Sequence, residues 1–245
     1  MKNSNSYEIL LDEPDFLILN KSPGLLVVPD RWDKGKETLR DIVQAKFGPE
    51  VWPVHRLDKA ASGVILFSKS KDSRTFLEKQ FRKREVNKIY HIFVQGELEK
   101  DEGSITYCIS EDRDRPGLVK VGGKHAKDAT THYEVLERFR GLTYVKVMPL
   151  TGRQHQIRLH FKALGNPVLC DPLYGSEDGY YLSEMKKFYK HKEEELEKPL
   201  MGRLALHALQ LTFFREDGTE VLAEAPLPKD FLVFLKYLRK FWKKR

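Results

Sequence analysis

Residues 55–63, HRLDKAASG, place one carboxylate among three basic side chains. Asp58 has Arg56 two residues before it and Lys59 directly after it, and His55 opens the stretch. The preceding VHRL is strand-like, so Asp58 is expected on a turn, with Arg56 pointing the same way. Nearby cations lower the pKa of a carboxylate, which suits a nucleophile or an electrostatic stabiliser better than a general acid. From these residues alone, a surface ion pair stays open as the alternative.

A second dense stretch is 149–175, PLTGRQHQIRLHFKALGNPVLCDPLYG. It predicts a helix after LTGR that ends at Gly165, with an apolar stripe. Arg158 lies about 100° round this helix from Ile157, at the edge of the buried face. The stripe consists of Ile157, Phe161 and Leu164. Three polar residues are expected in the first helical turn, where anions bind: Arg153, Gln154 and His155. A solvated helix face is the open alternative.

The patterns of metal and cofactor sites are missing from the sequence. There is no HExxH, and His155 and His160 are five residues apart, which separates them by about 140° on a helix. Neither GxxxxGK[ST], nor GxGxxG after a strand, nor GxSxG occurs. We therefore expect no metal and no cofactor.

Composition favours a soluble protein that meets polyanions. The chain has 245 residues, 40% of them hydrophobic and 32% charged, with a formal net charge of +7. No apolar run reaches the roughly 18–20 residues of a membrane helix, and the first residues lack a signal-peptide core. Cys108 and Cys170 belong to no CxxC pair, which indicates two buried thiols in a reducing compartment. A cytoplasmic protein is expected.

Strand patterns dominate the first two-thirds of the chain. The expected strands are YEILL, FLILN, LLVVP, SGVILFSK, NKIYHIFVQG, SITYCIS, THYEVLERF and LTYVKVMP, and LALHALQLTFFREDGTEVLAEAP reads as a hairpin. Helices are expected from Thr38 through Lys46, from Ser70 or Asp72 into FRKR, near 180–198 and from Asp230. The segment EDRDRPGLVKVGGKHAKDA is expected to be a long exposed loop. This order predicts an α+β fold with a mainly antiparallel sheet, in one continuous catalytic domain, 1–245.

Taken together, these stretches resemble the RluA-type pseudouridine synthases. HRLDKAASG is similar to the family's HRLDxxTSG signature, and NKIYHIFVQG to its second motif. LTGRQHQIRLHF followed by GNPVLCDPLYG is similar to the third. The ends fit too, with ILLDEPDFLILNKSPGLLVV at the start and LALHALQL with EAPLP later. The resemblance spans nearly the whole chain in order.

The resemblance implies a pseudouridine synthase fold, a mixed, mainly antiparallel bent sheet flanked by helices, with a central basic cleft. It implies conversion of uridine to pseudouridine in structured RNA, transfer RNA or ribosomal RNA, without a cofactor. Asp58 is then the catalytic aspartate, Arg158 its arginine partner and Tyr90 the aromatic side chain on the uracil. Arg56 is expected to enter the RNA stack where the target base flips out. His55, Arg153 and His155 are expected to bind the substrate.

The chain departs from the family pattern at three places. Ala61 stands where threonine is usual, Ser22 where proline is usual, and Gln154 where threonine or serine is usual. Loss of the hydroxyl at 61 is expected to lower the rigidity of the turn and to leave the reaction intact. None of the three removes a catalytic group.

We expect the extra N-terminal RNA-binding domain of many relatives to be absent, so that the catalytic domain itself grips RNA. Candidate grips are FRKREVNK (81–88), the loop 120–127 and the C-terminal helix, which ends in KKR. A solvated basic face is the alternative for each. A monomer is expected, because no coiled-coil seam is present.

Two other functions stay open. The net charge and Ala61 also fit an RNA-binding folding factor with idle or secondary catalysis. A different nucleoside enzyme, such as a glycosidase, would release free uracil.

Overall fold

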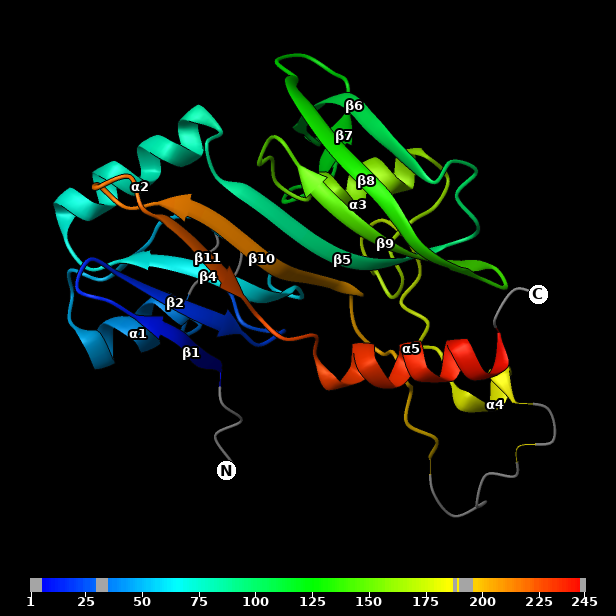
Figure 1. Cartoon of the computed structure of the whole chain (residues 1–245). Helices are drawn as coiled ribbons and strands as arrows, with labels where there is room; N and C mark the ends of the chain where they lie inside the picture. Colours follow the sequence, from blue (N-terminus) through cyan, green and yellow to red (C-terminus); the bar gives the residue numbers. More distant parts are fainter. Residues whose placement is uncertain (1–5, 30–34, 187–188, 190–195, 243–245) are drawn as a thin grey trace. The chain divides into compact units, whose positions relative to one another are not determined.

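The computed structural model describes residues 6–29, 35–186, 189 and 196–242, and the chain forms two compact units. The first unit comprises residues 1–90 and 207–226, and the second 91–206 and 227–245. Both units are discontinuous in sequence, because the chain leaves the first unit after Tyr90 and returns to it at His207. The strand β5, Asn87–Gln95, contains the first of these boundaries (Figure 1).

The described residues of the first unit form a mainly antiparallel arrangement of strands with two helices. The strand β2 pairs antiparallel with β1 and β4, and β11 pairs antiparallel with β10. A short parallel pairing joins β10 to β4, with His207 opposite Ser62 and Ala208 opposite Gly63. The elements are β1 (Tyr7–Asp12), β2 (Phe16–Lys21), α1 (Leu39–Phe47), β3 (Trp52–Pro53), β4 (Ser62–Ser68), α2 (Lys71–Lys83), β10 (Leu206–Phe214) and β11 (Glu220–Glu224).

Both faces of β2 and β4 are buried, which explains the continuous apolar runs FLIL and VILF within them. One face holds Leu19 and Ile65 against Leu39 and Val43 of α1. The other face holds Ile18, Leu66, Phe213 and Leu77, the last from α2. Burial of both faces fixes the register, since a shift by one residue would exchange the two sets.

The helices of this unit start as the sequence predicts. Thr38 and Ser70 each accept a backbone N–H three residues on, and Asp41 and Ser73 return the bond in a capping box. The expected ranges of α1 and α2 are thus confirmed.

In the part of the second unit that the structure describes, the chain forms a meander of strands and three helices. The strand β8 pairs antiparallel with β6 and β9, and β6 with β7. The terminal helix α5 packs Phe231 and Phe234 on Phe93, with ring centroids 5.4 and 5.0 Å apart. The elements are β6 (Glu102–Glu111), β7 (Val119–Val121), β8 (Lys127–Phe139), β9 (Leu142–Pro149), α3 (Gln156–Ala163), α4 (Leu182–Met185) and α5 (Lys229–Phe241).

Several expected elements differ from the structure. LLVVP is not a strand, because the carbonyls of Leu26 and Val27 accept the first N–H groups of α1. VHRL is not a strand either, and in this segment the strand β3 consists of Trp52–Pro53, which pairs with β4. The expected long loop contains β7, because Val119 finds a buried place beside α3.

Two further expectations need correction. The helix near 180–198 is described only as Leu182–Met185, and residues 187–188 and 190–195 lie outside the described residues, as does the terminal KKR. Of the two thiols, Cys170 is buried as expected, but Cys108 is exposed, because its side chain lies on the outer face of β6.

Candidate active site

The turn that carries Asp58 is braced from behind by His55. The Leu66 N–H donates to His55 Nε2 at 3.1 Å, and the imidazole stacks on Phe81 with centroids 4.9 Å apart. Burial, then the Lys88 charge, lowers the pKa of His55 to about 3. The ring is therefore neutral near pH 7, as its role of accepting the Leu66 N–H requires.

The turn itself is closed by backbone. The Ala61 N–H donates to the Asp58 carbonyl at 3.1 Å, and the Ala61 methyl is buried. Arg56 and Lys59 are exposed, while Asp58 is half-buried. The turn therefore presents its cations to solvent and keeps the carboxylate closer to the protein.

A buried ammonium, that of Lys21, also contacts this turn. Lys21 is 0% exposed, and its Nζ donates to the carbonyls of Ser22, Leu25 and Lys59 at 2.8, 2.9 and 3.2 Å. The Gly24 N–H also donates to the Lys59 carbonyl, at 2.7 Å. The loop after β2 is thus tied to the residue next to Asp58. Sequence reasoning gave Lys21 no role, although a lysine that closes the apolar strand FLILN was a usable signal.

The far end of the turn is fixed by a buried pair from distant segments. Ser62 Oγ and His207 Nδ1 are 2.9 Å apart, and His207 Nε2 is 3.3 Å from the Ala225 carbonyl. Gly63 has φ +115°, and a Cβ there would lie 2.1 Å from the Ala208 carbonyl oxygen. Only glycine allows this approach of β10 to β4. Neither His207 nor Ser62 was recognised from the sequence.

Tyr90 and Asp58 interact electrostatically in the first unit. Tyr90 packs on the cluster that contains Leu57 and Ala208, and burial, followed by the Asp58 charge, raises the pKa of its phenol. The phenol is therefore neutral near pH 7, so it can donate or relay a proton but is not a ready base. Two residues earlier on the same face of β5, burial and the Arg84 charge lower the pKa of Lys88 to about 8.

In the second unit, Arg158 is buried in an ion pair. Nε and Nη2 donate to Asp171 Oδ2 and Oδ1 at 2.8 and 2.6 Å, and the exposed fractions are 3% for Arg158 and 0% for Asp171. Its Cζ also lies 5.2 Å from the centre of the Tyr174 ring. The sequence placed Arg158 at the edge of the buried face, but it lies within it because Asp171 supplies the counter-charge. Asp171 itself was missed.

The three polar residues expected in the first turn of this helix precede it. The helix α3 begins at Gln156, whose amide oxygen accepts the Arg153 N–H at 2.9 Å and so ties the preceding loop to the helix. His155 has φ 50°, and its Nδ1 is 3.0 Å from the Tyr174 hydroxyl. Arg153 is exposed and donates from Nε to the Asp128 carbonyl at 3.2 Å, and Gln154 donates to the Gly117 carbonyl at 3.0 Å.

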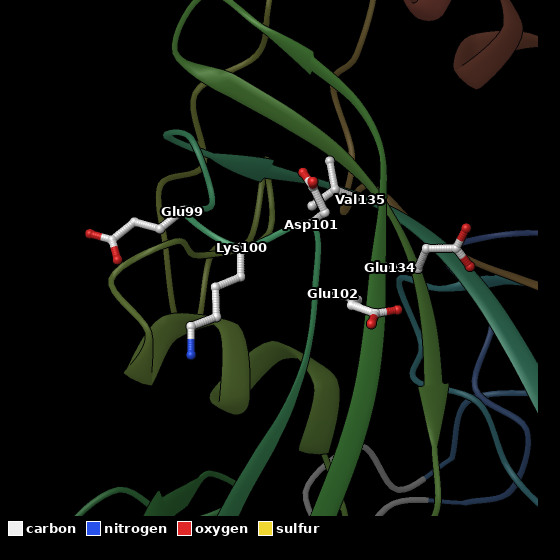
Figure 2. A pocket seen from close by; sticks show the side chains of 6 residues that line it. All are labelled: Glu99, Lys100, Asp101, Glu102, Glu134 and Val135. Atoms are coloured by element: carbon white, nitrogen blue, oxygen red, sulfur yellow. The ribbon is translucent and has the colours of Figure 1, made fainter.

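A separate hollow in the second unit is lined mostly by carboxylates (Figure 2). Its lining comes from the segment before β6 and from the facing part of β8. The lining residues are Glu99, Lys100, Asp101, Glu102, Glu134 and Val135. Carboxylates outnumber cations in this lining, which is the opposite of a phosphate-binding site.

The described part of the chain shows neither a metal centre nor a membrane span. Within it, no group of three or more His, Cys, Asp or Glu side chains could hold a metal ion. In the same residues, no helix is long and apolar enough to cross a membrane.

Comparison with known proteins places these residues in a family. A sequence model of the family described as RNA pseudouridylate synthase matches residues 15–163. The chain is 39% identical over 209 residues to the dual-specificity RNA pseudouridine synthase RluA of Haemophilus influenzae, covering 84% of this chain and 85% of that protein. It is 38% identical over 207 residues to the protein of the same name from Pasteurella multocida, covering 84% and 86%.

Solved structures agree with the sequence relatives. The structure of human RNA pseudouridylate synthase domain containing 1 superposes with a TM-score of 0.72 at 26% identity, covering 100% of this chain and 92% of that one. The expected pseudouridine synthase fold is thereby confirmed. The chain belongs to the RluA-type family of RNA pseudouridine synthases, the enzymes that isomerise uridine in RNA to pseudouridine.

Proposed function

We propose that this chain isomerises uridines in structured RNA, transfer RNA or ribosomal RNA, with Asp58 as the catalytic aspartate. The observation that carries the proposal is the placement of Asp58 on a braced turn, close enough to Tyr90 for its charge to raise the phenol pKa. A carboxylate and a neutral aromatic ring side by side can act on the sugar and the base of one flipped nucleotide. Several named relatives are dual-specificity synthases, and another, from Neisseria meningitidis, is ribosomal large subunit pseudouridine synthase D.

The reaction breaks the bond between C1′ and the uracil nitrogen, and the turned ring then forms a bond from carbon to C1′. Asp58 assists by attacking the nucleotide or by stabilising the sugar as that bond breaks. The ring carbon that forms the new bond loses its proton, and the nitrogen released from C1′ gains one. The reaction is therefore an isomerisation that requires no redox cofactor and no metal. A neutral Tyr90 stacks on the uracil, a contact worth about 1–3 kcal/mol for a base on an aromatic side chain, and relays a proton.

Access to the uridine requires that the base leave its stack, at a cost of a few kcal/mol. Arg56 is exposed beside the turn, which supports its proposed entry into the gap in the RNA. Arg153 is exposed and cationic, as phosphate contact requires, and His155 lies beside it at the start of α3. We assign His55 a supporting place behind the substrate, since its neutral ring braces the turn.

We further propose that Arg158 pairs with Asp58 and keeps it ionised during the reaction. The motif LTGRQHQIRLHF, in which Arg158 stands at the position of the family's arginine, is what supports this pairing. The protein is proposed to work as a monomer in the cytoplasm, with residues 1–245 as one catalytic domain.

The test is to incubate the purified protein with total RNA from a strain that lacks its gene, and to map new pseudouridines at single-base resolution. Asp58→Asn runs in parallel, because it keeps the backbone bond from Ala61 and removes only the charge. We expect sites with the native protein and none with the variant, and these sites also name the RNA. Full activity of the variant contradicts the proposal.

The alternative function, an RNA-binding folding factor, is separated by complementation. The formal net charge of +7 is the observation that favours it. If Asp58→Asn restores a deletion phenotype while it makes no pseudouridine, RNA binding is the function that matters to the cell. Failure to restore it, with RNA binding retained, supports the enzyme. Release of free uracil in either assay would indicate a glycosidase.

A further inference from the structure

The guanidinium of Arg158 is fixed by contacts with residues outside its own helix. Two of its three guanidinium nitrogens, Nε and Nη2, donate to the two oxygens of Asp171 in a fork. This geometry fixes the plane of the guanidinium, and it therefore fixes the direction in which Nη1 points. A single carboxylate thus sets the orientation of the proposed partner of Asp58.

Asp171 is itself held independently of Arg158. Its Oδ1 accepts the N–H groups of Leu173 and Tyr174 at 3.0 and 3.2 Å. Before it, Cys170 has φ 53°, in the left-handed region, and its Sγ lies 3.3 Å from the Asp178 carbonyl. Backbone bonds of Leu169 to Phe93 and Ala205 tie this turn to the rest of the unit. The carboxylate is therefore held by backbone groups as well as by the arginine.

Tyr174 closes the arrangement on another side. Its ring lies under the guanidinium, and its hydroxyl accepts the Val119 N–H at 3.0 Å. Its neighbours Val119 and Leu159 are buried with it in one cluster. A flat aromatic ring below and a carboxylate in the plane leave the guanidinium one orientation.

We propose that Asp171 is a positioning residue for catalysis, which acts by fixing the orientation of Arg158. The inference rests on the proposed pairing of Arg158 with Asp58. A buried ion pair is weak support for stability, because desolvation offsets the Coulombic gain. A gain in orientation, by contrast, acts on the chemical step, where a displacement of about 1 Å costs about 100-fold in rate.

The experiment measures single-turnover pseudouridine formation on the RNA identified by mapping, together with RNA affinity and melting temperature. Asp171→Asn keeps the size and an acceptor for the backbone N–H groups but loses the charge. We expect its rate to fall about 10- to 100-fold while RNA affinity stays within about twofold. A folded variant whose rate stays within about twofold of the native enzyme overturns the inference.

A matched control comes from the same unit. Arg203 donates in the same forked manner to Asp230, at 2.6 and 3.0 Å, and both are partly buried. Asp230→Asn should lower the melting temperature and leave the single-turnover rate within about twofold. Equal rate losses in the two variants would mean that general destabilisation is the cause, and would overturn the inference.

A double-mutant cycle separates positioning from any independent action of Asp171. Lysine cannot form the fork with Asp171. In an Arg158→Lys background we therefore expect Asp171→Asn to lower the single-turnover rate by less than about threefold. Full additivity overturns the inference. If Asp171→Asn does not fold, Asp171→Glu decides, since it keeps the charge but displaces it, and the same rate loss is expected. A native protein that modifies no RNA refutes the proposed function itself, before any variant is made.

Discussion

The turn that carries Asp58 and the helix that carries Arg158 are supported by different kinds of interaction. The turn is held by hydrogen bonds that involve backbone or neutral side chains, apart from the Lys21 ammonium. The helix holds its arginine through the charge of Asp171. Supports of the first kind fail by leaving polar groups unsatisfied, and supports of the second kind by leaving a charge uncompensated. The first type therefore stabilises the shape of a site, and the second stabilises the direction of a charged group.

The largest effect is expected at Gly63, where a substitution removes part of the support of the Asp58 turn and leaves the Arg158 helix unchanged. Gly63→Ala puts a Cβ into contact with the Ala208 carbonyl at a residue with φ +115°. We expect a loss of roughly 3 kcal/mol or more in the free energy of unfolding, measured in urea. Gly48→Ala is the control, because φ is +102° there but a Cβ meets nothing within 4 Å. Similar losses at the two positions would refute the role of close approach.

The ammonium of Lys21 gives the next effect. Lys21→Met keeps most of the unbranched side chain and leaves the carbonyls of Ser22, Leu25 and Lys59 without this donor. We expect a loss of about 3 kcal/mol in unfolding free energy and a slower single-turnover rate. Lys69→Met, which removes a partly exposed pair with Asp12, should cost less than about 1 kcal/mol. A Lys21 variant as stable as that control would show that the turn is held by other groups.

Two buried imidazoles, those of His160 and His55, test the effect of an unsatisfied polar group. Replacing each by phenylalanine should change the free energy of unfolding in opposite directions. His160 is 0% exposed, and among the described residues neither ring nitrogen has a hydrogen-bond partner, whereas His55 accepts the Leu66 N–H. We expect His160→Phe to stabilise the protein by about 1 kcal/mol and His55→Phe to destabilise it by a similar amount. Thermal or urea unfolding at pH 7 measures both, and equal signs would contradict this account.

The same imidazoles predict the response to acid. Burial lowers the pKa of His160 to about 4, and burial with the Lys88 charge lowers that of His55 to about 3. Below the ordinary pKa near 6.5 the unfolded chain binds a proton that the folded chain does not, so stability falls from about pH 6.5 toward pH 4. The slope of unfolding free energy against pH should be shallower in each of the two variants. An unchanged slope would mean that both rings already take up protons in the folded state.

The smallest effect is expected from Lys88, whose charge changes near the pH of assays. Its pKa of about 8 means that the ammonium loses its proton as pH rises from 7 to 9. If Lys88 contacts the phosphate backbone, RNA affinity should fall about two- to fivefold over that range. Lys88→Arg stays charged and should remove this pH dependence, as measured by titration at constant salt. A native protein whose affinity does not change with pH would remove Lys88 from the RNA-binding surface.

Local patterns predicted the helix starts and the buried strands because their causes are local. Thr38 and Ser70 cap the helices that follow them, and the apolar run in β4 records burial on both faces. The Asp58 turn was likewise predictable from HRLDKAASG. His207 was not predictable, because its partner Ser62 lies 145 positions away. Asp171 was not, because it meets Arg158, 13 positions before it, only once the turn after α3 has folded back. Lys21 was not, because only the folded loop places three carbonyls around its ammonium.

The hydrogen bond between Ser62 and His207 has a consequence for the time at which the enzyme becomes active. These residues are 145 positions apart, and their pairing closes the parallel contact behind the Asp58 turn. At a synthesis rate of about 5–20 residues per second, the ribosome needs roughly 7–30 s to make the intervening chain. During that interval the nascent chain carries Asp58 without its completed support. The turn that carries Asp58 therefore gains its complete support only after His207, near the end of the chain, has been made.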